Sequence, residues 1–336
     1  MKFNDESLRV AANLRQFYDA WIESARELDT CDVRLFWKAV NGAEYLVSRN
    51  RHGSERSLGR RAAATEQQFD DYAQRKLRLT EQEEARALRL QETCRLYIAL
   101  RLGAIASEAA AILRAADRRG LLDNCLRVVG TNALAAYELE AASRFAIGMD
   151  STEDFDLAWS ADKKTALALA AQSPVSIFGM LKAIDSTYTI NSERPFQARN
   201  AKAYEVELLV APSRVAALPG SIGLAPIPLP EQEWLLEGRP VDQVVCGRNG
   251  TPARIVAPDP RWFALHKLWM SDQDKRNPLK RPKDKRQGEA LLSAITAEMP
   301  HYPLDEAFRA TLPPELVPYF DAWRGAQVGL TTPRLF

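Results

Sequence analysis

The chain has little histidine, no close pair of cysteines and no long apolar run. Its 336 residues include three histidines and four cysteines, and no two of the cysteines form a CxxC pair; they are Cys31, Cys94, Cys125 and Cys246. The chain therefore has few residues from which a zinc site, a disulfide framework or a Ser/His/Asp triad could be built. We expect all four cysteines to be reduced and structural.

Membrane and bulk nucleic-acid binding also lack support. No stretch reaches the roughly 18 uncharged apolar residues of a membrane helix, and the opening MKFNDESLRV has no apolar signal core. We expect a cytoplasmic protein without a membrane partner. The formal net charge of +1 excludes the uniformly basic surface of a protein that coats nucleic acid. Carboxylates are better supplied, with 44 Asp and Glu residues, and 46% hydrophobic residues suffice for a large core.

Residues 1–120 have a mostly helical pattern with one interruption. Within FWKAVNGAEYLVSR, the Asn41-Gly42 step predicts a small β-hairpin. The basic segment RNRHGSERSLGRR follows. We interpret it as a flexible basic loop in preference to an electrostatic contact for an RNA acceptor stem.

Two helix boundaries in this region carry cap signals. Thr65 with Gln68 predicts a capping box that opens a long helix. In the next helix, SEAAAILRAADRR, Ser107 is placed to cap the start and Gly120 to end it.

Strands and helices alternate from residue 121 to about 235. CLRVVG, EDFDLAWS and KAYEVELLVAP predict strands, TNALAAYELEAA and VSIFGMLKAID predict helices, and RFAIGMDST predicts an inserted hairpin. Beyond the Pro-rich GLAPIPLP, the short strands VDQVVCG and PARIVAP precede helices that begin at Asp259. The fold class is therefore α+β, with a helical region over 1–120, a mixed-sheet core over 121–235 and a mainly helical region with a basic segment over 236–336.

Acidic residues occupy one face of two predicted strands. Successive side chains of a strand point to opposite faces, so Asp154 and Asp156 share a face, as do Glu205 and Glu207. Like charges placed together are costly unless a cation compensates them. Asp154, Asp156 and Glu207 therefore predict a magnesium site, while Glu205 is assigned to solvent or to a supporting role.

The turn VVGTNAL places a glycine and a hydroxyl at the start of a helix. Unpaired N–H groups there favour anions, so Gly130 and Thr131 are candidates to cradle a triphosphate. With the acidic strands, this pattern predicts phosphoryl or nucleotidyl transfer.

These motifs resemble the DNA polymerase β-type nucleotidyltransferase superfamily, with its Gly-Ser or Gly-Thr turn, D-x-D or D-x-E strand and third acidic strand. The chain is similar more narrowly to a bacterial family of predicted nucleotidyltransferases of toxin or defence type. Counterparts of WKAVNGAEYL, SLGRR, VVGTNALAAYE, DFDLAW, GMLKAIDSTYT, PDPRWFALHKLW and KRPKDKRQGEALL extend from about residue 35 to 295.

The resemblance implies a polymerase β-type core and assigns roles to five residues. Gly130 and Thr131 would contact the nucleotide, and Asp154, Asp156 and Glu207 would act as catalytic ligands of Mg²⁺ in a two-ion site. The family more often has Asp at the position of Glu207.

A basic segment, KRNPLKRPKDKR, lies near the C-terminal end. Such a run is usually a solvated loop, but related nucleotidyltransferase toxins have a similar Lys-Asp motif near the active site. Lys267, Lys280 and Lys283 are therefore candidates for nucleotide contact, with Asp284 orienting one of them. His266 is interpreted as a packing residue, and the nearby aromatic residues as core or interface; they are Trp262, Trp269, Phe320 and Trp323.

We expect a Mg²⁺-dependent enzyme that moves a nucleoside monophosphate from a nucleoside triphosphate to an acceptor and releases pyrophosphate. The acceptor is left open among tRNA, a partner protein and a small molecule. The alternative is a catalytically degenerate protein that binds a nucleotide or a partner.

Overall fold

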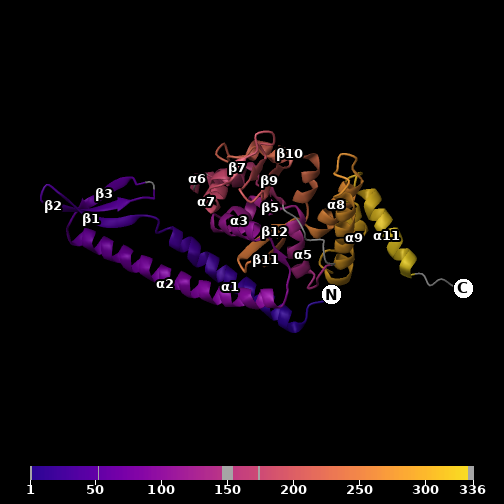
Figure 1. Ribbon diagram of the computed structural model, residues 1–336, viewed down its shortest axis with the longest axis horizontal. Helices are drawn as coiled ribbons and strands as arrows, with labels where there is room; N and C mark the ends of the chain where they lie inside the picture. Colours follow the sequence, from indigo (N-terminus) through magenta and orange to yellow (C-terminus); the bar gives the residue numbers. More distant parts are fainter. Residues whose placement is uncertain (1, 52, 146–153, 173–174, 332–336) are drawn as a thin grey trace. The chain divides into compact units, whose positions relative to one another are not determined.

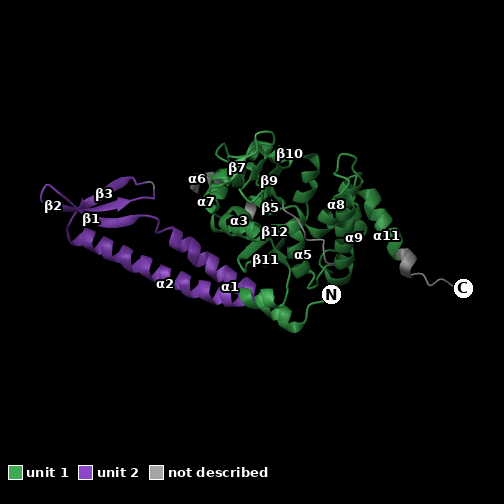
Figure 2. Ribbon diagram, viewed as in Figure 1, with its two compact units in different colours: residues 1–12, 94–336 green, residues 13–93 purple. Residues whose placement is uncertain are grey.

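The computed structural model describes residues 2–51, 53–145, 154–172 and 175–331. Contacts divide the chain into two compact units, residues 13–93 and residues 1–12 with 94–336 (Figure 2). The predicted hairpin in 144–152 falls largely outside the described residues. Among the described residues, no helix combines the length and apolar character that a membrane span requires.

The unit of residues 13–93 contains a three-stranded antiparallel sheet and parts of two long helices (Figure 1). Its elements are α1 Asp5–Asp29, β1 Arg34–Val40, β2 Ala43–Arg49, β3 Glu55–Arg60 and α2 Ala63–Ala99. The Asn41-Gly42 turn has φ values of 50° and 77°, so the hairpin prediction is confirmed. The prediction of a loop over the following basic segment is wrong for residues 55–60, which pair with β2.

Buried side chains join α1 and α2. Leu14, Tyr18, Trp21 and Ala25 recur every three or four residues, and all are fully buried. The Trp21 indole donates a hydrogen bond of 2.7 Å to Glu83 on α2. A polar partner thus satisfies the largest side chain in this interface.

Two cap predictions are wrong because the helices begin elsewhere. Thr65 lies inside the first turn of α2, where its hydroxyl accepts a hydrogen bond of 3.0 Å from the Ala62 N–H. Ser107 is the first residue of α3, and Ala106 precedes it without a side-chain cap. The expected end of α3 is confirmed, since Gly120 follows the helix with φ 70°.

The larger unit contains a mixed sheet in the order β5-β6-β9-β8-β7, with β10 beside β9. Strands β6 and β9 are parallel, whereas β5 and β8 are antiparallel to their neighbours β6 and β9. A parallel pair needs a long crossover, and helices α6 and α7 lie in it. The bounds are β5 Leu126–Val128, β6 Asp154–Trp159, α6 Lys163–Gln172, α7 Ile177–Ile184, β7 Thr189–Ile190, β8 Gln197–Arg199, β9 Glu205–Val210 and β10 Ile227–Pro228.

A second, three-stranded sheet and the remaining helices complete this unit. The sheet has the order β12-β11-β4, and α3 and α5 pack against it. Helices α8 and α9 pack together, with α11 against α8 (Figure 1). The bounds are β4 Ala104–Ile105, α3 Ser107–Arg118, α4 Leu121–Asn124, α5 Leu134–Glu140, β11 Val241–Gly247, β12 Pro252–Ala257, α8 Pro260–Asp272, α9 Arg281–Glu298, α10 Glu306–Arg309 and α11 Val317–Thr331.

One hydrophobic core extends from α3 to α11 in this unit. The four cysteines are free and buried, which confirms the sequence expectation. The strands predicted from CLRVVG, EDFDLAWS, KAYEVELLVAP, VDQVVCG and PARIVAP are all present, as is the helix that begins after Asp259. The structure is α+β with mixed sheets.

Candidate active site

The acidic face predicted from strand alternation is present on β6 and β9. In the parallel register Asp154 lies opposite Glu205, and Asp156 lies opposite Glu207. These carboxylates are half-buried, while the side chains on the other face are fully buried; they are Phe155, Leu157, Val206 and Leu208. The core therefore anchors both strands, and four acids share the opposite face.

Gly130 lies at the end of β5, immediately before a short 3-10 helix, Thr131–Ala133. The Val129 N–H donates to the Asp156 carbonyl at 3.2 Å, which holds the turn against β6. A Cβ placed on Gly130 would lie 2.0 Å from Oδ2 of Asp156. Only glycine permits this approach, and φ at Gly130 is −95°, so contact is the reason and backbone strain is not.

Asp156 is the carboxylate whose negative charge is least compensated by neighbouring groups. Among the described residues no side chain or backbone group hydrogen-bonds to its carboxylate. Burial, together with the charge of Asp154, raises the pKa of Asp156, although Lys267, Lys280 and Arg276 act in the opposite direction. An additional cation at this carboxylate would stabilise its charged form.

The pKa of Glu207 is also shifted, and its side chain is positioned by Gln197, which the sequence analysis did not identify. Burial and then the charge of Asp156 raise the pKa of Glu207. The Gln197 amide, 1% exposed on β8, donates to Glu207 Oε1 at 3.0 Å and to Glu205 Oε2 at 2.9 Å. Glu205 also pairs with Arg199, which agrees with a supporting role for Glu205. The alternation of Gln197 with buried Ala198 offered a weak signal, but only the β8–β9 register reveals its partner.

Asp154 is already paired in this structure. Lys280 Nζ donates to Asp154 Oδ2 at 2.6 Å, and the two side chains are 46% and 28% exposed. Burial acts to lower the pKa of Lys280, but the hydrogen bond to Asp154 and the negative charge of Asp154 together outweigh it and raise that pKa overall. Lys280, predicted to contact nucleotide, thus contacts one of the predicted metal ligands.

Two of the other predicted nucleotide contacts are enclosed. The side chain of Lys267 on α8 is 5% exposed and donates to Asp284 Oδ1 at 2.9 Å. Asp284 on α9 also accepts from Arg276 at 2.7 Å. Burial acts to raise the pKa of Asp284, but Lys267 and Arg276 outweigh it and lower that pKa. Thr131 is buried, and its hydroxyl accepts a long contact of 3.4 Å from Gln287 on α9.

Asp284 therefore does orient one of the lysines, as the sequence suggested. Lys283 also lies on α9, where burial and then the charge of Lys267 lower its pKa. The basic segment is only partly a loop, because α9 begins inside it at Arg281.

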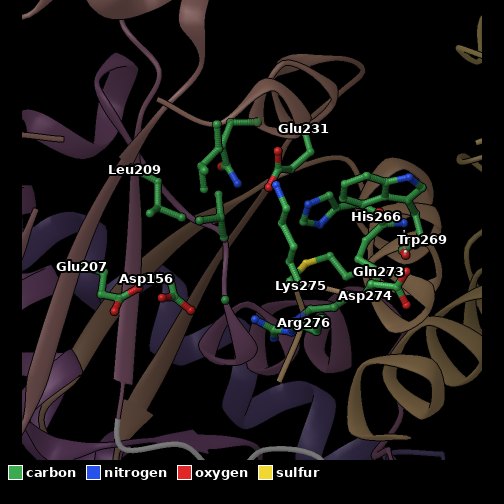
Figure 3. A pocket seen from close by; sticks show the side chains of 16 residues that line it. Asp156, Glu207, Leu209, Glu231, His266, Trp269, Gln273, Asp274, Lys275 and Arg276 are labelled. Atoms are coloured by element: carbon green, nitrogen blue, oxygen red, sulfur yellow. Dashed lines mark hydrogen bonds between the residues drawn. The ribbon is translucent and has the colours of Figure 1, made fainter. Parts of the chain in front are cut away.

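A pocket of about 670 Å³ adjoins the acids. Of the predicted site residues, Gly130, Asp156, Glu207 and Lys267 line it, whereas Thr131, Asp154, Lys280 and Lys283 do not. Figure 3 shows Asp156 and Glu207 together on one side and His266 with Trp269 on the other. The remaining lining residues are Val129, Leu209, Leu229, Glu231, Gln232, Met270, Gln273, Asp274, Lys275 and Arg276.

His266 packs in this wall, as the sequence suggested. It is 3% exposed, its ring stacks on Trp269 with centroids 6.2 Å apart, and burial lowers its pKa to about 3. The imidazole is therefore neutral near pH 7. Trp262 and Phe320 are buried in the core, and Trp269 and Trp323 are partly buried and pack against it, as expected; Trp269 also lines the pocket.

The residues present fit a divalent cation only in part. Within the described ranges, no group of three or more Asp, Glu, His or Cys side chains is arranged to hold a metal ion. Asp156 and Glu207 are nevertheless adjacent, half-buried carboxylates with raised pKa values. Mg²⁺ is commonly bound through one or two carboxylates, substrate phosphates and water, and two acids meet that requirement.

One of three comparisons with known proteins gives a match. A search of curated proteins and a search of solved structures each found no match. A protein-family model described as "Nucleotidyltransferase" matches residues 107–313, which include both acidic strands, the glycine turn and helices α8 and α9. The match covers more than half of the chain, and this protein belongs to that nucleotidyltransferase family as a transferase of the EC 2.7.7 type.

Proposed function

We propose that the enzyme moves a nucleoside monophosphate from a nucleoside triphosphate to an acceptor in a Mg²⁺-dependent reaction that releases pyrophosphate. One observation carries the proposal. The Asp156 carboxylate lies against Gly130, in register with Glu207, at the wall of a pocket large enough for a small-molecule ligand. Its charge is incompletely compensated by the described residues.

Asp156 and Glu207 would hold the metal, and Asp154 would join them by releasing Lys280. When bound, the metal neutralises phosphate oxygens and the charge that develops during transfer. Two ions of this kind are part of the proposal, as in the superfamily that the sequence resembles. Gln197 would keep Glu207 oriented through its hydrogen bond of 3.0 Å.

The basic residues would bind the polyphosphate. Lys267 lines the pocket and is fixed by Asp284, so its charge needs no reorientation when a phosphate arrives. Lys280, once released from Asp154, and Lys283 would supply mobile ammonium groups from the beginning of α9. Gly130 would leave room for the phosphate beside Asp156, and Thr131 would support the turn from behind.

We further propose a polymerase β-type arrangement of the core and a toxin or defence role, on the resemblance of the sequence motifs. The acceptor would be tRNA, a protein or a small molecule.

The experiment is to incubate the enzyme with each labelled nucleoside triphosphate, Mg²⁺ and one acceptor class at a time, and to measure pyrophosphate release. Asp156→Asn and Glu207→Gln should each lower the rate by at least about 100-fold. Asp274→Asn is the matched control, since Asp274 lines the same pocket but is fully exposed. Glu205→Gln should lower the rate less than Glu207→Gln, because Glu205 is outside the pocket lining but shares the Gln197 amide with Glu207.

Chelation should abolish the activity, and Mg²⁺ should restore it. Equal loss in Asp274→Asn and Asp156→Asn would contradict the assignment of the acids. Nucleotide binding without turnover on any acceptor class would instead favour the alternative, a regulatory protein that binds nucleotides.

A further inference from the structure

The far end of the pocket contains buried polar atoms without partners. Gln232 is 4% exposed and His266 is 3% exposed, and both line the pocket. Gln232 Oε1 and both ring nitrogens of His266 have no hydrogen-bond partner among the described residues. Buried polar atoms are nearly always hydrogen-bonded, so three unpartnered atoms in one wall point to a ligand that supplies the partners.

These groups carry no formal charge. Burial and the neighbouring Lys267 keep the imidazole of His266 neutral, and an amide is neutral at any relevant pH. A neutral imidazole has one N–H donor and one acceptor nitrogen, and an amide has an NH₂ donor and a carbonyl acceptor. Rotation of the amide exchanges the positions of its donor and its acceptor. The complementary ligand is a flat, neutral group with donors and acceptors along one edge.

Apolar surfaces flank the same groups. Leu229, Trp269 and Met270 line the pocket, and Trp234 packs edge-on against Trp269 with centroids 5.0 Å apart. Aromatic and aliphatic walls favour a planar ring over a phosphate. The carboxylates of Glu231 and Asp274 lie in the lining as well, which further opposes phosphate at this end.

The two ends of the pocket differ in chemistry. In Figure 3, Asp156 and Glu207 lie on one side, His266 and Trp269 on the other, and Lys275 and Arg276 are drawn between and below them. A nucleoside triphosphate has the same division, with a charged end for a metal and a neutral, planar end. If the triphosphate is held at the acids, as in the proposed function on which this inference rests, its base extends toward His266 and Trp269. Trp234, two residues after Gln232 in the chain, packs against both of these rings, with centroids 6.2 Å and 5.0 Å apart, so Gln232 belongs to the same end.

We propose that this end of the pocket binds the base of the nucleoside triphosphate and that the amide of Gln232 discriminates among the four bases. His266 forms the neutral wall beside the amide, and Trp269 provides the surface on which the base packs. Gln232 follows the Pro-rich segment that runs beside β9, since Ile227 of β10 is in register with Leu209.

The test measures the equilibrium affinity of each of the four nucleoside triphosphates, as non-hydrolysable analogues with Mg²⁺, and of inorganic tripolyphosphate. Wild type should bind the preferred nucleotide at least about tenfold more tightly than the least preferred one. Gln232→Met keeps the length of the side chain and removes the amide. It should reduce the preference to within about threefold and leave the affinity for tripolyphosphate unchanged.

Gln243→Met is the matched control, because Gln243 is partly buried and hydrogen-bonded to Glu140 outside the pocket lining. It should retain the wild-type preference. His266→Phe is a second variant in case Gln232→Met does not fold; it keeps the ring packing and should weaken nucleotide binding, again without effect on tripolyphosphate.

The outcomes separate this inference from the proposed function. Equal affinities for the four nucleotides, or a preference unchanged in Gln232→Met and His266→Phe, would overturn base recognition here while tripolyphosphate binding persists. Loss of binding of both nucleotide and tripolyphosphate by wild type would overturn the proposed function and this inference with it.

Discussion

Replacement of Gly130 by alanine tests the geometry of the site most directly. The new Cβ would lie 2.0 Å from Oδ2, 2.8 Å from Cγ and 3.0 Å from Cβ of Asp156. Relief of that overlap requires Asp156 and the turn to separate by roughly 1 to 1.5 Å. A displacement of about 1 Å at a reacting centre costs about 100-fold in rate, and we expect that loss in pyrophosphate release.

The same overlap should also appear in stability. Extra volume at a tightly packed position costs about 1 to 3 kcal/mol, which lowers the Tm of a unit this size by a few degrees. Gly220→Ala is the matched control, since a Cβ at Gly220 meets nothing within 4 Å. It should change neither the rate nor the Tm.

The double variant Gly130→Ala/Asp156→Ala separates contact from any other effect of the methyl group. Truncation of Asp156 removes the atoms that the new Cβ meets, so the Tm should recover while the activity stays lost. The reasoning is refuted if Gly130→Ala alone retains activity within about threefold of wild type and its Tm matches that of Gly220→Ala.

Other perturbations give distinct outcomes. Asp284→Asn leaves Lys267 buried without its carboxylate and should cost about 3 to 5 kcal/mol in chemical denaturation; a loss below about 1 kcal/mol would argue against a buried pair. Because the pKa of Asp284 is lowered in the folded state, its stabilisation is complete above the ordinary carboxylate pKa and is lost as pH falls through the folded value. The Tm of wild type should therefore fall more than the Tm of Asp284→Asn when the pH is lowered from 6 into the acidic range. Scanning calorimetry at each pH measures both values. Lys280→Met removes a partly exposed pair with Asp154 and should cost about 1 kcal/mol or less, as measured by urea unfolding. Gly42→Ala, at φ 77°, should destabilise the hairpin by about 1 kcal/mol and speed its amide hydrogen exchange, with no effect on pyrophosphate release.

Local patterns predicted much of the acidic face of β6 and β9. The alternation of acids with buried apolar residues on β6 and β9 depends only on the two-residue period of a strand, and Asn41-Gly42 needs only the preference of a tight turn for positive φ. Such features are encoded within a few residues. The prediction that Gly130 lies near the acids is also confirmed. Its tight turn directly follows a strand, and this connection allows few other positions for the glycine.

Long-range pairing limited the rest. The partner of Glu207 is Gln197 on an antiparallel neighbour, and no local pattern specifies which strand lies beside β9. The sequence predicts that Lys267 is a mobile ammonium group that contacts nucleotide. In the structure, α9 covers this side chain and Asp284 neutralises its charge. Gln232 follows a Pro-rich segment with no periodicity, so no sequence pattern indicated that it is a pocket residue.

Two of the positive charges near Asp156 are fixed in place by the fold. Lys267 and Arg276 are both bound to Asp284, and each also acts to lower the pKa of Asp156. Fixed positive groups of this kind cost little reorganisation when charge develops nearby. They do not fully offset the burial of Asp156, whose pKa stays raised, so the unliganded site favours a further cation. Cation binding should therefore stabilise the folded enzyme, and more strongly when a triphosphate supplies the remaining oxygen ligands, because each ligand then binds a site that the other has completed.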